Sequence, residues 1–168
     1  MIPALADAGV TKIVIVNRTP ENAEYVAGII RRDHPDLGIE TGTIKDIPRF
    51  VKNQKFDLVL NTTDVGQEGL EGRGGLSPLG STELPREENL AVSGSIIEAL
   101  KAENPDIIFA DIVYTPLITP FLRQAQSRGL RISQGDMMLI HQAALAFQFI
   151  VGTNNAYEEI VGVMKKAF

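Results

Sequence analysis

A polar turn that could bind a phosphate group follows the most β-branched stretch of the chain. Asn17, Arg18 and Thr19 come directly after the apolar residues 13–16. A buried strand, a polar turn and a helix form one βα unit, and in a dinucleotide-binding fold the end of that strand lies beside the adenosine ribose. An enzyme that uses NAD places a carboxylate there, whereas an arginine can stack on the adenine and pair with a 2′-phosphate. The turn therefore favours NADP as the ligand, with an ordinary turn after a core strand as the alternative.

Polar residues also stand at or near the ends of two other apolar runs. Thr62 and Thr63 follow the run 56–61, and Asp111 lies inside the run 107–114. Small polar residues at the carboxyl end of a parallel strand can approach a cofactor closely, although they also suit a simple turn. A carboxylate in a core strand needs a hydrogen-bonding partner or a position facing a cleft. The ends of these two strands are therefore candidate functional positions, with a turn or a buried hydrogen-bonding partner as the structural alternative.

A histidine and a glutamine interrupt the apolar helix predicted over residues 137–151. Polar side chains in such a helix are usually satisfied core or cleft residues, so His141 is more simply structural than catalytic. Gln142 offers both a hydrogen-bond donor and an acceptor, which suits a polyhydroxyl substrate. The sequence holds two histidines in all, and His34 lies in a polar turn that predicts a solvated loop residue.

Composition excludes several classes of function. The 168 residues are 44% hydrophobic and 22% charged, as in a globular domain, and the net charge of −5 argues against nucleic acid as a partner. Without cysteine, disulfides and thiolate metal sites are excluded, and two histidines make a multi-histidine metal site improbable. We therefore predict no bound metal.

Nothing in the sequence points to a membrane or to secretion. The first residues carry no basic segment followed by a long apolar core, as a secretory signal would. No run approaches the roughly 18 uncharged apolar residues of a membrane-spanning helix. We expect a soluble, cytoplasmic protein.

Strand-like and helix-like segments alternate along the chain. Strands are expected at 12–17, 38–44, 56–61, 107–114 and 130–133, with helices at 20–32, 47–53, 93–103, 119–128, 137–151 and 157–168. Residues 67–85 are rich in glycine and are expected to form a long, exposed and mobile loop.

This alternation predicts the fold class α/β, with a Rossmann-like doubly wound parallel sheet. The usual first strand and its G-x-G-x-x-G turn are lacking. Residues 1–168 are thus interpreted as one incomplete dinucleotide-binding domain with C-terminal helices. The strands at 12–17 and 56–61 would normally flank the lacking strand, so we expect marginal stability or self-association, for instance as a homodimer.

Four ordered motifs resemble the cofactor domain of the shikimate dehydrogenase family. Asn-Arg-Thr at 17–19 is similar to the family's motif after its second strand, and residues 61–66 (NTTDVG) resemble its Asn-Thr-Thr-Pro-x-Gly segment. Residues 111–116 (DIVYTP) with Thr119-Pro120 resemble Asp-x-x-Tyr-x-Pro…Thr-Pro, and residues 135–142 (GDMMLIHQ) resemble Gly-x-x-Met-Leu-x-x-Gln. Together the motifs span nearly the whole chain.

The resemblance implies the cofactor-binding part of an NADP-linked oxidoreductase that reduces 3-dehydroshikimate to shikimate, on the route to aromatic amino acids. It implies cofactor-binding roles for Asn17, Arg18, Thr19, Asn22, Thr62, Thr63, Ile112, Gly135 and Met138, and substrate-binding roles for Tyr114 and Gln142. Of these, the first four would lie at the adenosine 2′-phosphate end, and Asn22 stands where the family often has Lys or Arg. Ile112, Gly135 and Met138 would lie near the nicotinamide.

The sequence also departs from the family pattern. Asp64 and Gln67 replace the usual Pro and Met. The family's N-terminal substrate domain, with its catalytic Lys and Asp, has no counterpart here, so no catalytic residue is assigned and the chain alone is expected to be inactive.

Other functions stay open. One alternative is a quinate/shikimate dehydrogenase that uses NAD. Another is a non-catalytic binding or oligomerisation module derived from the fold. Glutamyl-tRNA reductase shares a similar Asn-Arg-Thr stretch, but residues 135–142 argue against it.

Overall fold

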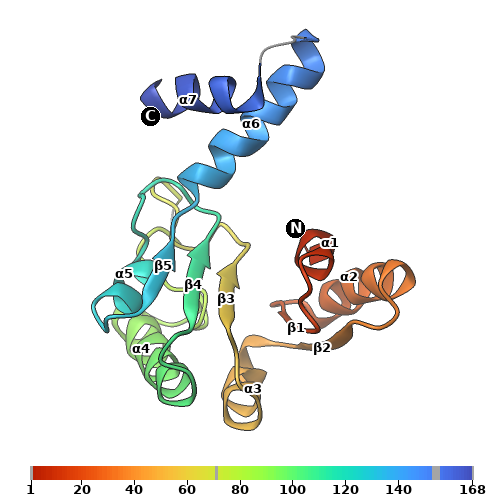
Figure 1. The fold of residues 1–168 in the computed structure, drawn as a ribbon. Coiled ribbons are helices and arrows are strands. Elements are labelled where there is room, and N and C mark those ends of the chain that lie inside the picture. Colours follow the sequence, from red (N-terminus) through yellow and green to blue (C-terminus); the bar gives the residue numbers. More distant parts are fainter. Residues whose placement is uncertain (1, 71, 153–155, 168) are drawn as a thin grey trace. The chain divides into compact units, whose positions relative to one another are not determined.

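The computed structural model describes residues 2–70, 72–152 and 156–167. The chain forms two compact units, residues 1–54 and residues 55–168, each described here by itself. Both units combine parallel strands with helices, so the predicted α/β class is confirmed (Figure 1).

The first unit is a two-stranded parallel sheet with helices around it. Its elements are α1 (Ile2–Asp7), β1 (Lys12–Val16), α2 (Pro20–Asp33), β2 (Gly38–Gly42), a 3₁₀ turn η1 (Ile44–Asp46) and α3 (Ile47–Asn53). β1 and β2 pair in parallel from Lys12 opposite Gly38 to Val16 opposite Gly42. The spacing of Ala23, Ala27 and Ile30 places them on one face of α2, and all three are buried as the helical pattern predicts.

The residues of β1 are less buried than their sequence predicts. The continuous β-branched run at residues 13–16 predicts a strand covered on both faces of a sheet, yet all four residues are half-buried. Among the described residues β1 pairs with β2 alone, so one edge of the strand has no ladder partner. A continuous β-branched run suits a strand with neighbours on both edges, and the described part of this unit provides one neighbour.

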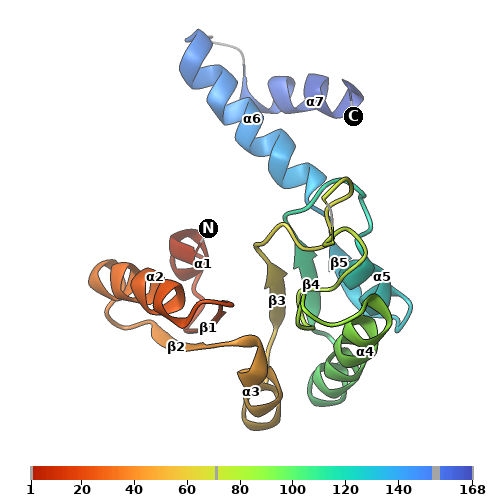
Figure 2. The same cartoon turned by 180° about the vertical axis from the view of Figure 1, so that it is seen from behind.

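The second unit has a three-stranded parallel sheet in the order β3-β4-β5. Its elements are β3 (Leu58–Asn61), α4 (Arg86–Glu103), β4 (Ile108–Asp111), α5 (Pro120–Gln126), β5 (Arg131–Ser133), α6 (Asp136–Val151) and α7 (Tyr157–Ala167). α4 and α5 lie side by side against this sheet, which Figure 2 shows from behind. Their buried residues Ile97, Leu100 and Phe121 form its core together with Phe109 of β4.

All five predicted strands form in parallel sheets, and the edges of β1 and β3 beside the lacking strand have no ladder partner among the described residues. The five strands make a two-stranded sheet and a three-stranded sheet, because no described strand pairs with both β1 and β3. These are the two strands that the sequence placed on either side of the lacking strand. The local pattern specified each strand, but sheet continuity requires a partner for both free edges.

The glycine-rich segment 67–85 is exposed at residues 67–70 and 72, as its composition predicts, but its later part is not. Leu76, Ser77 and Leu79 are buried, and the Asn89 side chain accepts a hydrogen bond from the Ser77 backbone nitrogen at 2.8 Å. The Asn89 amide also donates to the backbone oxygens of Ser77 and Ser81, each at 3.1 Å. Asn89 can reach them because α4 begins at Arg86 and not at residue 93 as predicted. This part of the segment is therefore packed against α4.

α6 and α7 pack against each other through a separate apolar cluster of Ile140, Ala144, Ile160 and Val161. No helix among the described residues has the length and apolar character required to cross a membrane.

The core of the second unit supplies a matched pair of substitutions. Phe109 is fully buried, with its ring centroid 5.4 Å from that of Phe121, whereas Phe149 is 91% exposed. Phe109→Ala should lower the free energy of unfolding by about 3–5 kcal/mol through lost burial and an unfilled cavity. Phe149→Ala should change it by about 0.5 kcal/mol or less. Urea denaturation of both variants measures the difference, and equal effects would contradict the packing described here.

Candidate functional site

The turn after β1 carries an exposed arginine side chain, Arg18, that has no partner among the described residues. The Asn17 side-chain oxygen accepts a hydrogen bond from the Thr19 backbone nitrogen at 2.9 Å, and the Asn17 backbone nitrogen donates to Gly42 at 3.0 Å. Asn17 thereby fixes the turn, and Arg18 is exposed with no hydrogen bond or ion pair to any residue that the structure describes. The guanidinium is available to a ligand.

This arginine stands beside the start of a long helix. Thr19 is the N-cap residue of the 14-residue α2, and its side chain makes no capping hydrogen bond. Unpaired backbone N–H groups and the helix dipole favour an anion at such an end. Asn22 lies exposed in the first turn, where Glu21 contributes an opposing negative charge. The predicted phosphate-binding residues thus form one contiguous surface on the first unit.

In the second unit, the side chain of Asn61 organises the turn after β3. Its Oδ1 accepts hydrogen bonds from the Thr63 backbone nitrogen at 3.0 Å and the Thr63 hydroxyl at 2.7 Å. The Val65 backbone nitrogen donates to the same hydroxyl at 3.2 Å. Thr63 therefore shapes the turn with its hydroxyl, while Thr62 is exposed and free to face a ligand.

Asp111 ends β4 and is only 3% exposed. Its carboxylate accepts hydrogen bonds from Asn61 Nδ2 at 2.9 Å, from the Val113 backbone nitrogen at 2.9 Å and from the Thr119 hydroxyl at 2.7 Å. Burial raises the pKa of Asp111, and the donated hydrogen bonds oppose that shift. The predicted strand 107–114 ends at residue 111 because the Asp111 side chain draws the following backbone into a turn.

The turns after β4 and β5 touch each other through a glycine. A Cβ atom on Gly135 would lie 2.4 Å from the carbonyl oxygen of Ile112 and 2.7 Å from that of Val113. Only a residue without a side chain permits this approach. Two predicted site residues, Ile112 and Gly135, are therefore adjacent, although the sequence separates them by 23 positions.

The remaining predicted site residues are exposed close to these turns in sequence. Tyr114 follows β4 and is 43% exposed, and Met138 and Gln142 are exposed on α6. Because Met138 and Gln142 are four residues apart in one helix, they share a face. His141 instead turns toward α7, where its Nδ1 is hydrogen-bonded to the Tyr157 hydroxyl, so it serves helix packing.

An ion pair that the sequence did not predict closes the loop after β3. Arg73 Nη1 lies 2.8 Å from both carboxylate oxygens of Asp64. The Gly66 nitrogen donates to the Arg73 carbonyl at 3.0 Å, and the Glu68 nitrogen donates to the Thr115 carbonyl at 2.8 Å. Asp64, which replaces the proline expected from the family motif, thus has a partner within the glycine-rich segment. A charged pair nine residues apart in a loop leaves no periodic signal in the sequence.

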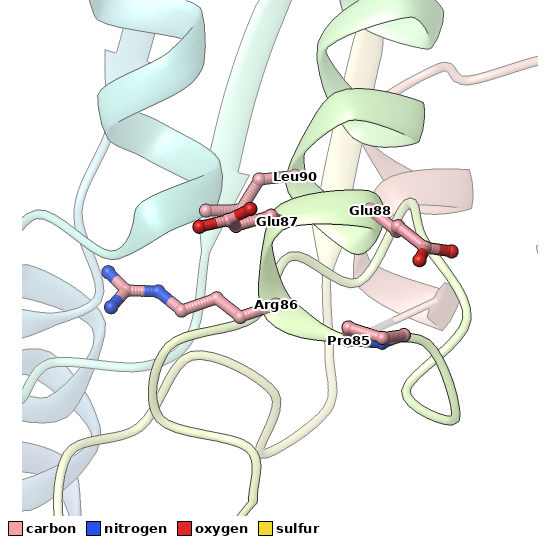
Figure 3. A pocket seen from close by; sticks show the side chains of 5 residues that line it. All are labelled: Pro85, Arg86, Glu87, Glu88 and Leu90. Atoms are coloured by element: carbon pink, nitrogen blue, oxygen red, sulfur yellow. The ribbon is translucent and has the colours of Figure 1, made fainter.

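Two surface hollows lie away from the predicted site residues. One, with a volume of about 430 Å³, is lined by Pro85, Arg86, Glu87, Glu88 and Leu90 at the start of α4 (Figure 3). Its two carboxylates disfavour a phosphate. The other, of about 340 Å³, lies in the first unit beside His34, which caps the C-terminus of α2 in the predicted loop. No group of three or more metal-binding side chains occurs among the described residues.

The fold defines the class of protein, a Rossmann-like α/β protein with parallel sheets. No family model matches the chain. A shikimate dehydrogenase (NADP(+)) of Rhizobium meliloti is 33% identical over 159 residues, which cover 95% of this chain and 45% of the relative. The corresponding enzyme of Archaeoglobus fulgidus is 29% identical, over 98% of this chain and 49% of the relative.

Solved structures agree with these relatives. Shikimate 5-dehydrogenase of Thermus thermophilus, in complex with NADP(H) and shikimate, matches 98% of this chain and 49% of that chain with 27% identity and a TM-score of 0.59. A quinate dehydrogenase of Corynebacterium glutamicum, at 20% identity and a TM-score of 0.67, matches 97% of this chain and 49% of its own and shows the fold alone. By sequence, the chain is similar to the shikimate dehydrogenases that its motifs resemble. It spans about half the length of the curated relatives it matches, in their C-terminal half.

The contact at Gly135 makes a steric prediction. Gly135→Ala should destabilise the second unit by about 1–3 kcal/mol, because its Cβ would overlap backbone atoms that cannot move aside. Gly162→Ala is the control, since a Cβ there meets no atom within 4 Å and α7 gains helix propensity. Thermal unfolding should show a lower midpoint for the first variant alone, and an unchanged midpoint would contradict the close approach.

The raised pKa of Asp111 makes a prediction about pH. Ionisation of this buried carboxyl opposes folding, so its contribution to stability is full below the pKa of the unfolded chain and falls as pH rises through the folded value. Wild type should therefore become more stable relative to Asp111→Asn as the pH is lowered from 7 toward the ordinary aspartate pKa, about 3.9. Urea denaturation at several pH values measures this difference. A difference that stays constant or shrinks on acidification would exclude the shift.

Proposed function

We propose that this chain is the NADP-binding part of an oxidoreductase that reduces 3-dehydroshikimate to shikimate. Its relatives are named for this enzyme and for NADP, and the structure from Thermus thermophilus holds NADP(H) and shikimate. The observation that carries the proposal is the unpaired Arg18 at the end of β1, beside the start of α2.

Arg18 would recognise the 2′-phosphate that distinguishes NADP from NAD. A guanidinium can form two parallel hydrogen bonds to a phosphate, and such charge-assisted bonds are about twice as strong as neutral ones. The Asn17 side chain holds the backbone of the turn in shape, so the ligand need not reorder the main chain around Arg18. Thr19 and Asn22 would add polar contacts at the same helix end.

The second unit would contact the nicotinamide end and the substrate. Ile112, Gly135 and Met138 would lie near the nicotinamide, and Thr62 and Thr63 would line the cofactor. Tyr114 and Gln142 would contact the substrate. The carbonyl of Ile112 packed on Gly135 gives this part of the proposed site a rigid backbone wall. When bound, NADPH supplies the hydride, and the residues named here hold and orient the reactants.

We assign no catalytic acid or base to this chain. Reduction of a carbonyl needs a positioned proton donor within hydrogen-bond reach, and none of the residues proposed here takes that role. The chain by itself is therefore proposed to bind the nucleotide without turnover. The cytoplasmic location and the homodimer stay predictions, the second supported by the edge of β1 that has no ladder partner among the described residues.

Titration calorimetry with NADP and NAD tests the proposal. Wild type should bind NADP more tightly than NAD, and Arg18→Ala should weaken NADP binding about tenfold to hundredfold, the value of a charge-assisted phosphate contact. Its affinity for NAD should stay within about twofold, because NAD lacks the phosphate.

Arg32→Ala is the matched control. Arg32 is an exposed arginine at the other end of α2, in its last turn. Its removal lowers the net charge equally and should leave NADP binding unchanged. If neither nucleotide binds to wild type, the proposal fails and a non-catalytic binding or oligomerisation module is favoured. If NAD binds more tightly than NADP, the alternative NAD-dependent quinate/shikimate dehydrogenase is favoured.

A further inference from the structure

The carboxylate of Asp111 joins three segments of the second unit. It accepts hydrogen bonds from Asn61 at the end of β3, from Val113 in the turn after β4, and from Thr119 at the N-cap of α5. Thr119 in turn accepts a hydrogen bond from the Leu122 backbone nitrogen at 3.3 Å. Two of the three segments carry proposed ligand-binding residues, Thr62 and Thr63 in one and Ile112 and Tyr114 in the other.

The Asn61 amide has its orientation fixed from both sides. Its Nδ2 donates to Asp111 Oδ1 at 2.9 Å and to the Val65 carbonyl at 3.1 Å, and its Oδ1 receives two bonds from Thr63. Rotating the amide by 180° would bring its NH₂ group against the two donors of Thr63. The same rotation would leave Asp111 and the Val65 carbonyl facing an oxygen. An acceptor at position 111 therefore selects the orientation that holds the turn 62–65.

We propose that Asp111 is a positioning residue that acts through Asn61 to hold Thr63 and the turn 62–65 in the conformation that binds the nucleotide. The inference rests on the proposed function, because it gives this turn a place at the cofactor. Its chemical requirement is an acceptor oxygen facing Asn61 Nδ2 and the Val113 N–H. Negative charge is not required.

Asparagine satisfies that requirement and leucine does not. In Asp111→Asn the side-chain oxygen can keep the bonds from Asn61 and Val113, while the new NH₂ group donates to the Thr119 hydroxyl, which can accept. In Asp111→Leu both N–H donors lose this acceptor, because the branched side chain that replaces the carboxylate is larger and apolar. Thr119→Val is the matched control, since it removes a hydrogen bond to the other carboxylate oxygen and leaves Asn61 bound.

Residue-resolved hydrogen exchange of the full chain measures the turn directly, without a ligand. The amides of Thr63 and Val65 should stay protected in wild type, Asp111→Asn and Thr119→Val, and should exchange about tenfold or more faster in Asp111→Leu. The amides of Ile97 and Leu100 in α4 should not change, which shows that the fold persists. Fast exchange at Thr63 in Asp111→Asn or Thr119→Val, with α4 still protected, would overturn the proposal.

A fourth variant, Asn61→Ala, tests the proposal if Asp111→Leu fails to fold. Asn61→Ala removes the residue through which Asp111 acts and leaves the carboxylate bound to Val113 and Thr119. It should release the Thr63 and Val65 amides as Asp111→Leu does. Continued protection of both amides in Asn61→Ala would show that the turn does not depend on this route.

Calorimetry with NADP separates this inference from the proposed function. In a wild type that binds NADP, Asp111→Leu should weaken binding about tenfold, and Asp111→Asn should restore it to within about threefold of wild type. If exchange changes but affinity does not, the turn is not part of the site and the proposal falls. If wild type binds no NADP, the proposed function fails, and the place of the turn at the cofactor falls with it. The exchange data then still establish or exclude the coupling of Asp111 to Thr63.

Discussion

The hydrogen bond between Asn61 and Asp111 joins the ends of two neighbouring strands where the sheet becomes polar. The two residues are register partners and the last residues of β3 and β4, and both are buried. A carboxylate and an amide in an apolar sheet are costly unless every donor finds an acceptor. Here each atom of both groups is bonded, so the cost of burial becomes a constraint on the surrounding backbone. The two turns, which carry the proposed site residues Thr62, Thr63, Ile112 and Tyr114, take their shape from that constraint.

The glycine-rich segment follows the same rule over a larger area. Backbone N–H and C=O groups must find hydrogen-bond partners where the segment is buried. The Asn89 side chain in the first turn of α4 bonds one such N–H group, of Ser77, and two carbonyls, of Ser77 and Ser81. The Ser77 hydroxyl continues the network through Ser93 to Gln124 on α5, with 2.7 Å at each step. Among the described residues no buried side-chain nitrogen or oxygen lacks a partner. The part of the segment around Ser77 is therefore packed into the second unit.

The sequence predicted the elements well because their signals are local. The β-branched run at 13–16, the spacing of Ala23, Ala27 and Ile30, and Thr119 followed by Pro120 each identify an element within a few residues. It failed where the deciding partner is distant. The start of α4 and the burial of the glycine-rich segment depend on Asn89 contacting Ser77. A carboxylate within an apolar strand is evident in the sequence at Asp111, but nothing there identifies Asn61, 50 residues away, as its partner. In the first unit, Arg18 could be identified from its position, but its lack of a partner could not.

What distinguishes Arg18 from other exposed arginines that have no partner in the described part of the chain, such as Arg32, is its place after β1 and beside the start of α2. Arg31, Arg73 and Arg128 each form an ion pair with a carboxylate of the chain, as expected at a net charge of −5. Arg18 stands in a turn that Asn17 has fixed, beside helix N–H groups that no side chain caps. The Arg18 side chain adds little to the free energy of unfolding, because an exposed and unpaired charge contributes almost nothing to folding. We therefore propose an anion from solution as its partner, because a phosphate matches both the guanidinium and the helix end.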